Sequence, residues 1–258
     1  MRAVEQGPQS KIGDATRERR PADGEVFEVM MTERKAGSKA RENILARIRK
    51  AQGRGLSKPS QAELEAIDTY LRAHPRGTLP KVEGDLVARF RARAEAMQCT
   101  TDEVASEGDV PAAVARYLKA GNLPHSGCVW PQLAHLDWKA AGLSLELRAA
   151  NADDPIGVTG AFAAIAETGT LVLASGPETP ATASLLPETH VAVLSAQRIV
   201  PHMEDAFALA REAFGQMPRA INFVSGPSRT ADIDQTIVLG VHGPARVHIV
   251  LVATEIRG

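Results

Sequence analysis

The stretch SGPSRTADI, Ser225–Ile233, places three hydroxyl side chains, an arginine and an aspartate within nine residues. It follows the apolar run INFV, which predicts a strand, and its Gly226-Pro227 pair predicts a turn. We expect Ser228 or Thr230 to cap a following helix. The free backbone N–H groups of such a helix attract a phosphate or a carboxylate, so the stretch predicts a site for a small anion.

Two charged residues of this stretch support different interpretations. Arg229 favours the anion site, because a guanidinium binds a carboxylate or phosphate through two parallel hydrogen bonds. Asp232 favours an ordinary helix start, because a carboxylate in the first turn satisfies the helix dipole by itself. From the residues alone, both interpretations stay open.

A second candidate lies in AIAETGTLVLASG, residues 164–176, where Glu167-Thr168-Gly169 forms a turn before an apolar run. A glutamate at such a junction is partly removed from water, which suits an acid, a base or a nucleophile. The other interpretation is structural, with the carboxylate accepting hydrogen bonds from backbone amides of the turn. We keep Glu167 as a candidate catalytic residue, and Thr168 and Gly169 as candidate ligand-binding residues.

A third candidate is the segment VLGVHGPARVHIV, in which Gly240 and Gly243 flank His242. A loop histidine there could act as a general base or donate a hydrogen bond, or it could be exposed without a role. His248 falls within a predicted strand, where we expect a core or interface histidine with its hydrogen bonds satisfied, and His190 opens another predicted strand. No HxH or HExxH spacing occurs, so the sequence predicts no metal site.

The elements that position these residues alternate between strands and helices from about residue 109 onward. The strand-like runs are nearly continuous in apolar residues, which is typical of strands covered on both faces. The sequence therefore predicts an α/β fold with a mainly parallel open sheet, helices on both faces and additional N-terminal helices. The expected strands are SGCVW, LSLELRA, TLVLAS, HVAVLSA, AINFVS and RVHIVLVA; PQLAHLDW predicts a helix, and GAFAAIAETG a helix or a turn.

The organisation along the chain predicts three parts. Residues 1–35 are polar and aperiodic, which indicates a disordered lead-in. Residues 36–80 contain amphipathic helices, one of which opens at a capping box formed by Ser60 and Glu63. Residues 81–258 are expected to form the α/β domain.

Composition excludes several classes of function. The formal net charge of −1 gives no field that recruits nucleic acid, and no apolar run approaches the length of a membrane span. Cys99 and Cys128 are the only cysteines, so the chain cannot ligate a four-cysteine iron–sulfur cluster, and we expect a cytoplasmic protein. The sequence also lacks G-x-G-x-x-G, the P-loop pattern and G-x-S-x-G. It therefore predicts no cofactor in this chain.

Two blocks, Gly157–Gly176 and Ser225–Val252, resemble the lactate-utilisation protein C family, whose members consist mainly of a LUD domain. The resemblance implies a fold similar to sugar-phosphate isomerases and CoA transferases. It also implies a role in oxidising L-lactate to pyruvate with partner proteins that carry the iron–sulfur clusters. The positions of the two blocks that the resemblance offers as a cleft are Glu167, Thr168, Gly169, Gly226, Pro227, Ser228, Thr230, Asp232, Gly240 and Gly243.

Three functions remain open at this point. The first is a non-redox subunit of a lactate-oxidising complex, with a small carboxylate or phosphate bound at the predicted cleft. The second is a stand-alone transferase or isomerase that uses Glu167 as nucleophile or base, which rests on fold analogy alone. The third is an assembly or regulatory protein in which the same loops are structural.

Overall fold

The computed structural model describes residues 39–53, 58–230 and 238–256. The chain divides into two units, Met1–Pro75 and Arg76–Gly258. The predicted lead-in over residues 1–35 lies outside the described residues, and the predicted domain boundaries stay predictions. Within the described part of the chain, no helix combines the length and the apolar character needed to cross a bilayer.

The first unit contains a helix over residues 39–51 and α2 (Gln61–Ala73). The capping box that opens α2 is confirmed, because Ser60 and Glu63 each bond the backbone N–H group of the other. None of the residues of α2 is buried, and Ile67 and Leu71 on its apolar side are exposed.

The second unit is built on an entirely parallel six-stranded sheet, with its strands in the order β1-β12-β7-β4-β2-β3. This arrangement confirms the predicted α/β fold with a mainly parallel sheet. The strands are β1 (Thr100–Val104), β12 (Arg246–Val252), β7 (Thr189–Ser195), β4 (Ile156–Gly160), β2 (Ser126–Val129) and β3 (Ser144–Leu147).

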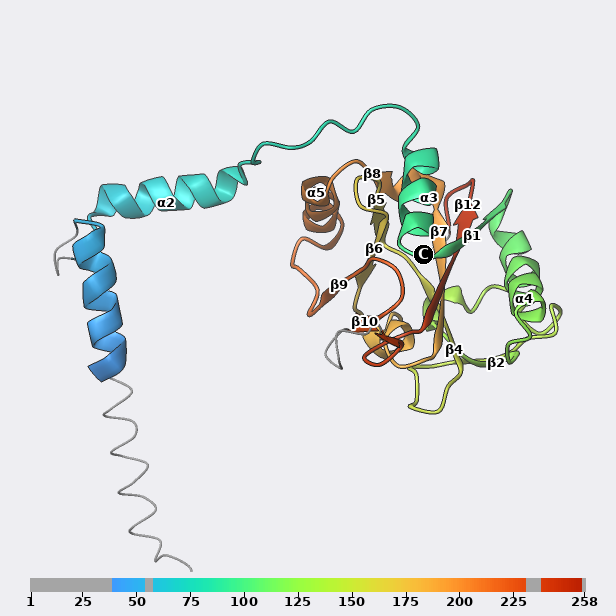
Figure 1. Cartoon of the computed structure of the whole chain (residues 1–258). Coiled ribbons are helices and arrows are strands. Elements are labelled where there is room, and N and C mark those ends of the chain that lie inside the picture. Colours follow the sequence, from blue (N-terminus) through green and yellow to red (C-terminus); the bar gives the residue numbers. More distant parts are fainter. Residues whose placement is uncertain (1–38, 54–57, 231–237, 257–258) are drawn as a thin grey trace, which may run out of the picture. The chain divides into compact units, whose positions relative to one another are not determined.

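The described residues of this unit also form a smaller four-stranded sheet, a two-stranded sheet and the α-helices α3, α4 and α5 (Figure 1). The small sheet has the order β8-β5-β6-β9, and its β5–β6 and β6–β9 pairs are antiparallel. Its strands are β8 (Ile199–Val200), β5 (Ala163–Ile165), β6 (Thr170–Ala174) and β9 (Ile221–Val224), and β10 (Arg229–Thr230) pairs with β11 (Val238–Leu239). The helices are α3 (Leu86–Ala96), α4 (Val110–Ala120) and α5 (Met203–Phe214).

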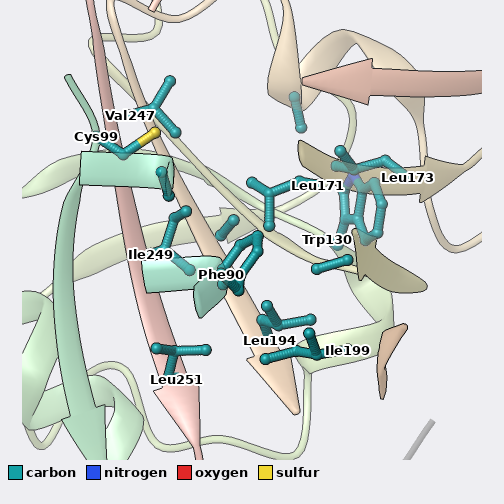
Figure 2. Packing of buried hydrophobic residues seen from close by; sticks show 14 of the residues in the cluster. Phe90, Cys99, Trp130, Leu171, Leu173, Leu194, Ile199, Val247, Ile249 and Leu251 are labelled. Carbon is teal, nitrogen blue, oxygen red and sulfur yellow. The ribbon is translucent and has the colours of Figure 1, made fainter. Parts of the chain in front are cut away.

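The six-stranded sheet carries a separate core on each face, and each central strand supplies both. In β12, Ile249 belongs to the core beneath α3, whereas Val250 belongs to the core beneath α4. Figure 2 shows Phe90 of α3 among Ile249 and Leu194 of the large sheet and Leu171 of the small one. Because successive side chains of a strand point to opposite faces, two buried faces require a continuous apolar run.

The small sheet separates the α3 core from an outer layer. Leu171 of β6 faces α3, while Val172 joins Ala206 of α5 in a third cluster. The layers are therefore α4, the large sheet, then α3 together with the small sheet, and finally α5. The predicted helices on both faces of the parallel sheet are present, and the small sheet shares one face with α3.

Two predicted helical segments are different in the structure. Only Pro131–Leu133 of PQLAHLDW is helical, as a 3₁₀ turn, and the Trp138 indole N–H donates to the Leu133 carbonyl oxygen at 3.1 Å. The segment GAFAAIAETG contains the strand β5, whose residues pair with β6, followed by a turn. In GAFAAIAETG, the pairing of β5 with β6 overrides the weak local preference of small residues for a helix.

Candidate functional site

Glu167 lies in the tight turn between β5 and β6 and contacts a histidine that the sequence did not single out. Its Oε2 lies 2.8 Å from Nδ1 of His202, which precedes α5, and the two side chains are 29% and 11% exposed. His202 is held in place because its backbone N–H donates to the Asp205 carboxylate at 3.1 Å. The turn therefore presents a half-buried carboxylate–imidazole pair, an arrangement that can accept or donate a proton.

A helix that begins directly after Ser228, one of the two predicted starts, is wrong, and a helix capped by Thr230 would lie outside the described residues. Arg229 and Thr230 form strand β10, and the Ser228 backbone N–H donates to the Pro244 carbonyl oxygen at 2.8 Å. The Ser228 carbonyl oxygen in turn accepts from the Gly240 N–H at 3.0 Å. Since the Ser228 backbone groups already have partners, the helix-terminus argument for an anion site fails at this point. Asp232 lies outside the described residues.

The loop lies beside the large sheet, at the amino ends of its parallel strands. Its preceding strand, β9, belongs to the antiparallel small sheet, so the rule that ligands collect beyond the carboxyl ends of parallel strands does not apply. Gly243 approaches Ser228 closely, and the next residues, Pro244 and Ala245, lead into the amino end of β12. The loop therefore borders the amino ends of the parallel strands.

The Glu167 turn and the Gly226 loop adjoin each other, as the sequence predicts for a shared site. A chain of hydroxyl contacts links Thr168 to Thr170 at 2.6 Å and Thr170 to Ser225 at 2.7 Å. Gly169 and Gly226 both pack on α3 and its C-terminal end. The ligand-binding role of this set stays a prediction, because these contacts describe packing and do not reveal a bound group.

The remaining predicted positions are a buried proline, an arginine and the residues around the loop histidine. Pro227 is buried, the Arg229 guanidinium donates to the Met97 carbonyl oxygen, and Gly240 and Gly243 lie against Ala245 and Ser228 respectively. His242 is exposed between them. Among the described residues, no group of three or more His, Cys, Asp or Glu side chains is placed to hold a metal ion.

The two strand histidines, His190 and His248, are both buried. Burial lowers the pKa of His190 to about 4, and its Nε2 lies 2.8 Å from the Thr159 hydroxyl oxygen. Burial also lowers the pKa of His248 to about 4, and its ring stacks on Tyr117 at 3.8 Å between ring centres. At neutral pH both imidazoles are therefore uncharged structural groups.

A crevice that sequence reasoning missed lies where the order of the parallel strands reverses. The chain passes from β2 outward to its neighbour β3, whereas from β4 it passes to β7 on the opposite side. Connections that diverge in this way leave a gap beyond the carboxyl ends of the two strands, the usual ligand position in open α/β sheets. Gln132 follows β2, and Ala161 and Phe162 follow β4.

The first cavity of this crevice has a volume of about 350 Å³ and a charged wall. Arg198 lines it half-buried, with its guanidinium carbon 5.8 Å from the centre of the Phe162 ring. Among the residues that the structure describes, no carboxylate forms an ion pair with Arg198, and the exposed Glu255 also lines the cavity. The polar residues that line this cavity are Gln132, Ser195, Arg198 and Glu255, and Gly160 also lines it.

Because Gly160 has no side chain, Gln132 and Trp130 can lie close to the end of β4. A Cβ at this position would lie 3.1 Å from Oε1 of Gln132 and 3.7 Å from Cε3 of Trp130. Glycine therefore lets the Gln132 amide and the Trp130 ring pack directly on the strand end. A sequence signal did exist, since Gly160 ends an apolar strand, but it resembles many other glycines at strand ends.

A second cavity of about 370 Å³ shares Gln132, Ala161 and Phe162 with the first. Its wall combines aromatic and proline side chains with small and amide residues, and the Phe214 ring centre lies 4.8 Å from that of Phe162. A third cavity, of about 430 Å³, lies beyond β1 and β12 and is lined mainly by apolar residues. Glu167 and the Ser228 loop line none of these three cavities.

Residues 130–252 match the family described as the LUD domain. The resemblance of the two sequence blocks to this family is thereby confirmed. The matched region begins at Trp130, beside the crevice, and ends with the last residue of β12. It includes Arg198, Phe162 and Gln132 together with the Glu167 turn and the Ser228 loop.

Several relatives are proteins named lactate utilization protein C. The chain is 38% identical over 129 residues to that of Bacillus licheniformis, covering 48% of this chain and 53% of the relative. It is 43% identical over 101 residues to that of an Exiguobacterium species (38% and 44% covered) and 38% identical over 101 residues to that of Bacillus subtilis (38% and 42% covered). The chain thus spans about half the length of these curated relatives.

One solved structure is also similar to the chain. It is the crystal structure of a DUF162 family protein from Deinococcus radiodurans, with a TM-score of 0.49 and 23% sequence identity. The similarity covers 67% of this chain and 100% of that protein.

Proposed function

Because residues 130–252 match the LUD domain, we propose that this chain takes part in L-lactate utilisation as a subunit that carries no redox centre of its own. The names of the relatives from three bacteria support the link to lactate. The cysteine count supports placing the iron–sulfur clusters in partner proteins, since two cysteines cannot supply the four thiolates of a conventional cluster. In this proposal, iron–sulfur partner proteins accept the two electrons that leave lactate as it becomes pyruvate.

The observation that carries the proposed binding site is the guanidinium of Arg198 in the crevice beyond β2 and β4. It is half-buried, lines a cavity and, within the described residues, lacks a carboxylate partner. An arginine in such a place binds the carboxylate of lactate or pyruvate through two parallel hydrogen bonds. Removal from bulk water strengthens that interaction, because the local dielectric constant is lower than that of water.

The neighbours of Arg198 fit a small hydroxy acid or keto acid. Gln132 offers an amide, which can donate a hydrogen bond to a keto oxygen or accept one from a hydroxyl group. The Phe162 ring beside the guanidinium supplies an apolar surface for the carbon chain of the acid. Glu255 adds a negative charge to the rim, but water screens it because its side chain is exposed.

Binding measurements on matched arginine variants test this site. Arg198→Gln should weaken L-lactate and pyruvate binding at least about tenfold in isothermal titration calorimetry, which corresponds to about 1.4 kcal/mol. Arg246→Gln is the control, because Arg246 already pairs with Glu188 at 2.8 Å at the amino end of β12. Equal affinities in the two variants, or no binding of either acid to the natural chain, would remove Arg198 from the proposal.

The role in a complex has its own test. A tagged chain should co-purify with iron–sulfur proteins from cells grown on lactate, and its deletion should stop growth on lactate as the carbon source. A chain that purifies alone, from cells whose growth on lactate does not need it, would contradict the proposed role whatever the crevice binds.

The Glu167–His202 pair favours a second candidate function, acyl transfer or proton transfer by a stand-alone enzyme. A carboxylate hydrogen-bonded to an imidazole is suited to act as nucleophile or base. As nucleophile toward a CoA thioester, Glu167 would form an acyl anhydride while the CoA thiolate leaves. Mass spectrometry after incubation with acyl-CoA and hydroxylamine would detect the modified Glu167 peptide, and an unmodified peptide would contradict this candidate.

A further inference from the structure

The two cavities of the crevice differ in the chemistry of their walls. The first is lined by the charged residues Arg198 and Glu255, whereas the described residues that line the second include aromatic rings and prolines and none with a charge. Trp130 presents an apolar surface there, because its indole N–H already donates to the Pro180 carbonyl oxygen at 2.9 Å. The residues that give the second cavity its apolar character are Trp130, Phe162, Pro177, Phe214 and Pro218.

The cavities adjoin because one short segment lines both. Gln132, Ala161 and Phe162 belong to each wall, and the Phe162 ring contacts both Arg198 and Phe214. The distances from the Phe162 ring centre are 5.8 Å to the Arg198 guanidinium carbon and 4.8 Å to the Phe214 ring centre. A ligand held by Arg198 therefore has an aromatic surface within reach of its next few atoms.

The volumes exceed what lactate needs. A lactate ion displaces on the order of 100 Å³, about the volume of three or four waters. The first cavity alone measures about 350 Å³, and the second adds an apolar space of about 370 Å³. Lactate would leave most of this space to water, and water is a poor neighbour for aromatic and proline walls.

We propose that the crevice binds a 2-hydroxy or 2-oxo acid with a side chain larger than methyl, its carboxylate on Arg198 and its apolar or aromatic side chain against Phe214 in the second cavity. The proposal rests on the proposed function for the carboxylate end and adds the class of side chain. Polar and apolar ends of one ligand would then be recognised by two different walls, as in most small-molecule sites.

A series of acids with the same head group tests the side-chain preference on the full chain. Isothermal titration calorimetry would compare L-lactate, L-2-hydroxyhexanoate and L-3-phenyllactate at equal ionic strength. We expect phenyllactate to bind at least about tenfold more tightly than lactate, because its ring leaves water for an apolar wall. Arg198→Gln should weaken all three acids.

Two phenylalanines of α5 form a matched pair of variants. Phe214→Ala should reduce the advantage of phenyllactate over lactate at least about threefold, because it removes one aromatic wall. Phe207→Ala should preserve that advantage, since Phe207 packs on Phe223 at 5.6 Å and does not line the cavity. Phe214 is 38% exposed, so its truncation should preserve the fold, and circular dichroism would confirm this.

The outcomes separate this inference from the proposed function. Equal affinities for the three acids, or equal effects of Phe214→Ala and Phe207→Ala, would overturn the side-chain preference and leave the lactate site intact. Binding of the larger acids through Arg198 without measurable lactate binding would support the preference and remove lactate as the ligand. If none of the acids binds, both proposals fail.

Discussion

The Glu167 turn with the Gly226 loop and the crevice around Arg198 are opposite kinds of region. The first contains the most conspicuous sequence motifs, and its backbone packs closely on α3 and on the amino end of β12. The second contains ordinary residues between elements, yet it surrounds two cavities and a guanidinium that has no carboxylate partner among the described residues. The described backbone groups of the motif-rich region contact α3 and the amino end of β12, whereas residues of the inconspicuous region line two cavities.

Glycines and hydroxyl side chains have two common uses that look alike in sequence. A glycine that allows close backbone approach can serve a ligand or a neighbouring helix. Here Gly226 and Gly169 allow close packing against α3. The atoms nearest to an added Cβ belong to Met97 for Gly226, and to Arg93 and Ala94 for Gly169. If the two regions have separate roles, substitutions in one should change stability and substitutions in the other should change binding.

The largest expected effect concerns stability in the motif-rich region. Gly226→Ala would place a Cβ 2.2 Å from the Met97 carbonyl oxygen, at a backbone φ of +82° that L residues rarely adopt. We expect the free energy of unfolding to fall by about 4 kcal/mol, from a steric and a conformational contribution. Urea unfolding would measure this loss.

The control for Gly226 is a glycine with the same backbone conformation and open space. Gly84 has a φ of +84°, and a Cβ added there would meet no atom within 4 Å, so Gly84→Ala should cost only about 1 kcal/mol. Equal losses for the two variants would show that contact with α3 does not fix the Gly226 loop.

Acidification should give the next largest effect, and it separates stability from binding. Burial lowers the pKa of His190 to about 4, whereas the unfolded chain titrates near 6.5. Both states are neutral above the unfolded value, so the full stability is present there. As the pH falls from about 6.5 to about 4, the unfolded chain takes up a proton that the folded chain does not, and roughly 3 kcal/mol is lost.

Replacing this histidine should flatten that dependence. His190→Gln should reduce the slope of unfolding free energy against pH, while His242→Gln should leave it unchanged because His242 is exposed. Arginine stays protonated throughout, so the contact between Arg198 and a carboxylate should persist as long as the chain is folded and the acid is ionised. If acid binding and the unfolding free energy both fell together as the pH was lowered to about 5, the two regions would not have separate roles.

Sequence patterns predicted β7 and β12 of the large sheet well, because these two strands are buried on both faces, whereas β1 and β4 were not among the expected strands. The apolar runs HVAVLSA and RVHIVLVA contain β7 and β12 and leave little choice of periodicity. Capping at Ser60 was equally local, since the partner lies three residues away. Where the signal depends only on neighbouring residues or on complete burial, sequence is sufficient.

The rest depends on contacts between distant residues. The predicted helix start at Ser228 was wrong, because Arg229 and Thr230 pair with Leu239 and Val238 as a strand. The crevice could not be found either, because the reversal of strand order places Gln132, Phe162 and Arg198 together from three separate segments. None of these residues belongs to a motif that would have connected it with the others.

A smaller effect is expected in the crevice at Gly160. Gly160→Ala should push the Gln132 amide by a few tenths of an ångström, because the new Cβ would lie 3.1 Å from its Oε1. We expect acid binding to weaken about threefold in calorimetry while the unfolding free energy changes by less than about 1 kcal/mol. Gly108→Ala is the control, since its Cβ would meet only Ser106 Oγ at 3.8 Å. A large loss of stability at Gly160 would instead assign this glycine to packing.

The smallest expected effect concerns Glu167, and its result could assign a catalytic role to the motif-rich region. Glu167→Gln keeps the size of the side chain and removes the charge that faces His202. Because the Glu167 side chain is 29% exposed, the change should cost no more than about 1 kcal/mol of unfolding free energy, and it should not alter acid binding at Arg198. Calorimetry and growth on lactate would be measured together on this variant. If the variant folds and binds acid normally but no longer supports growth, the motif-rich turn performs chemistry after all. The crevice would then be a binding region that works beside a separate catalytic carboxylate.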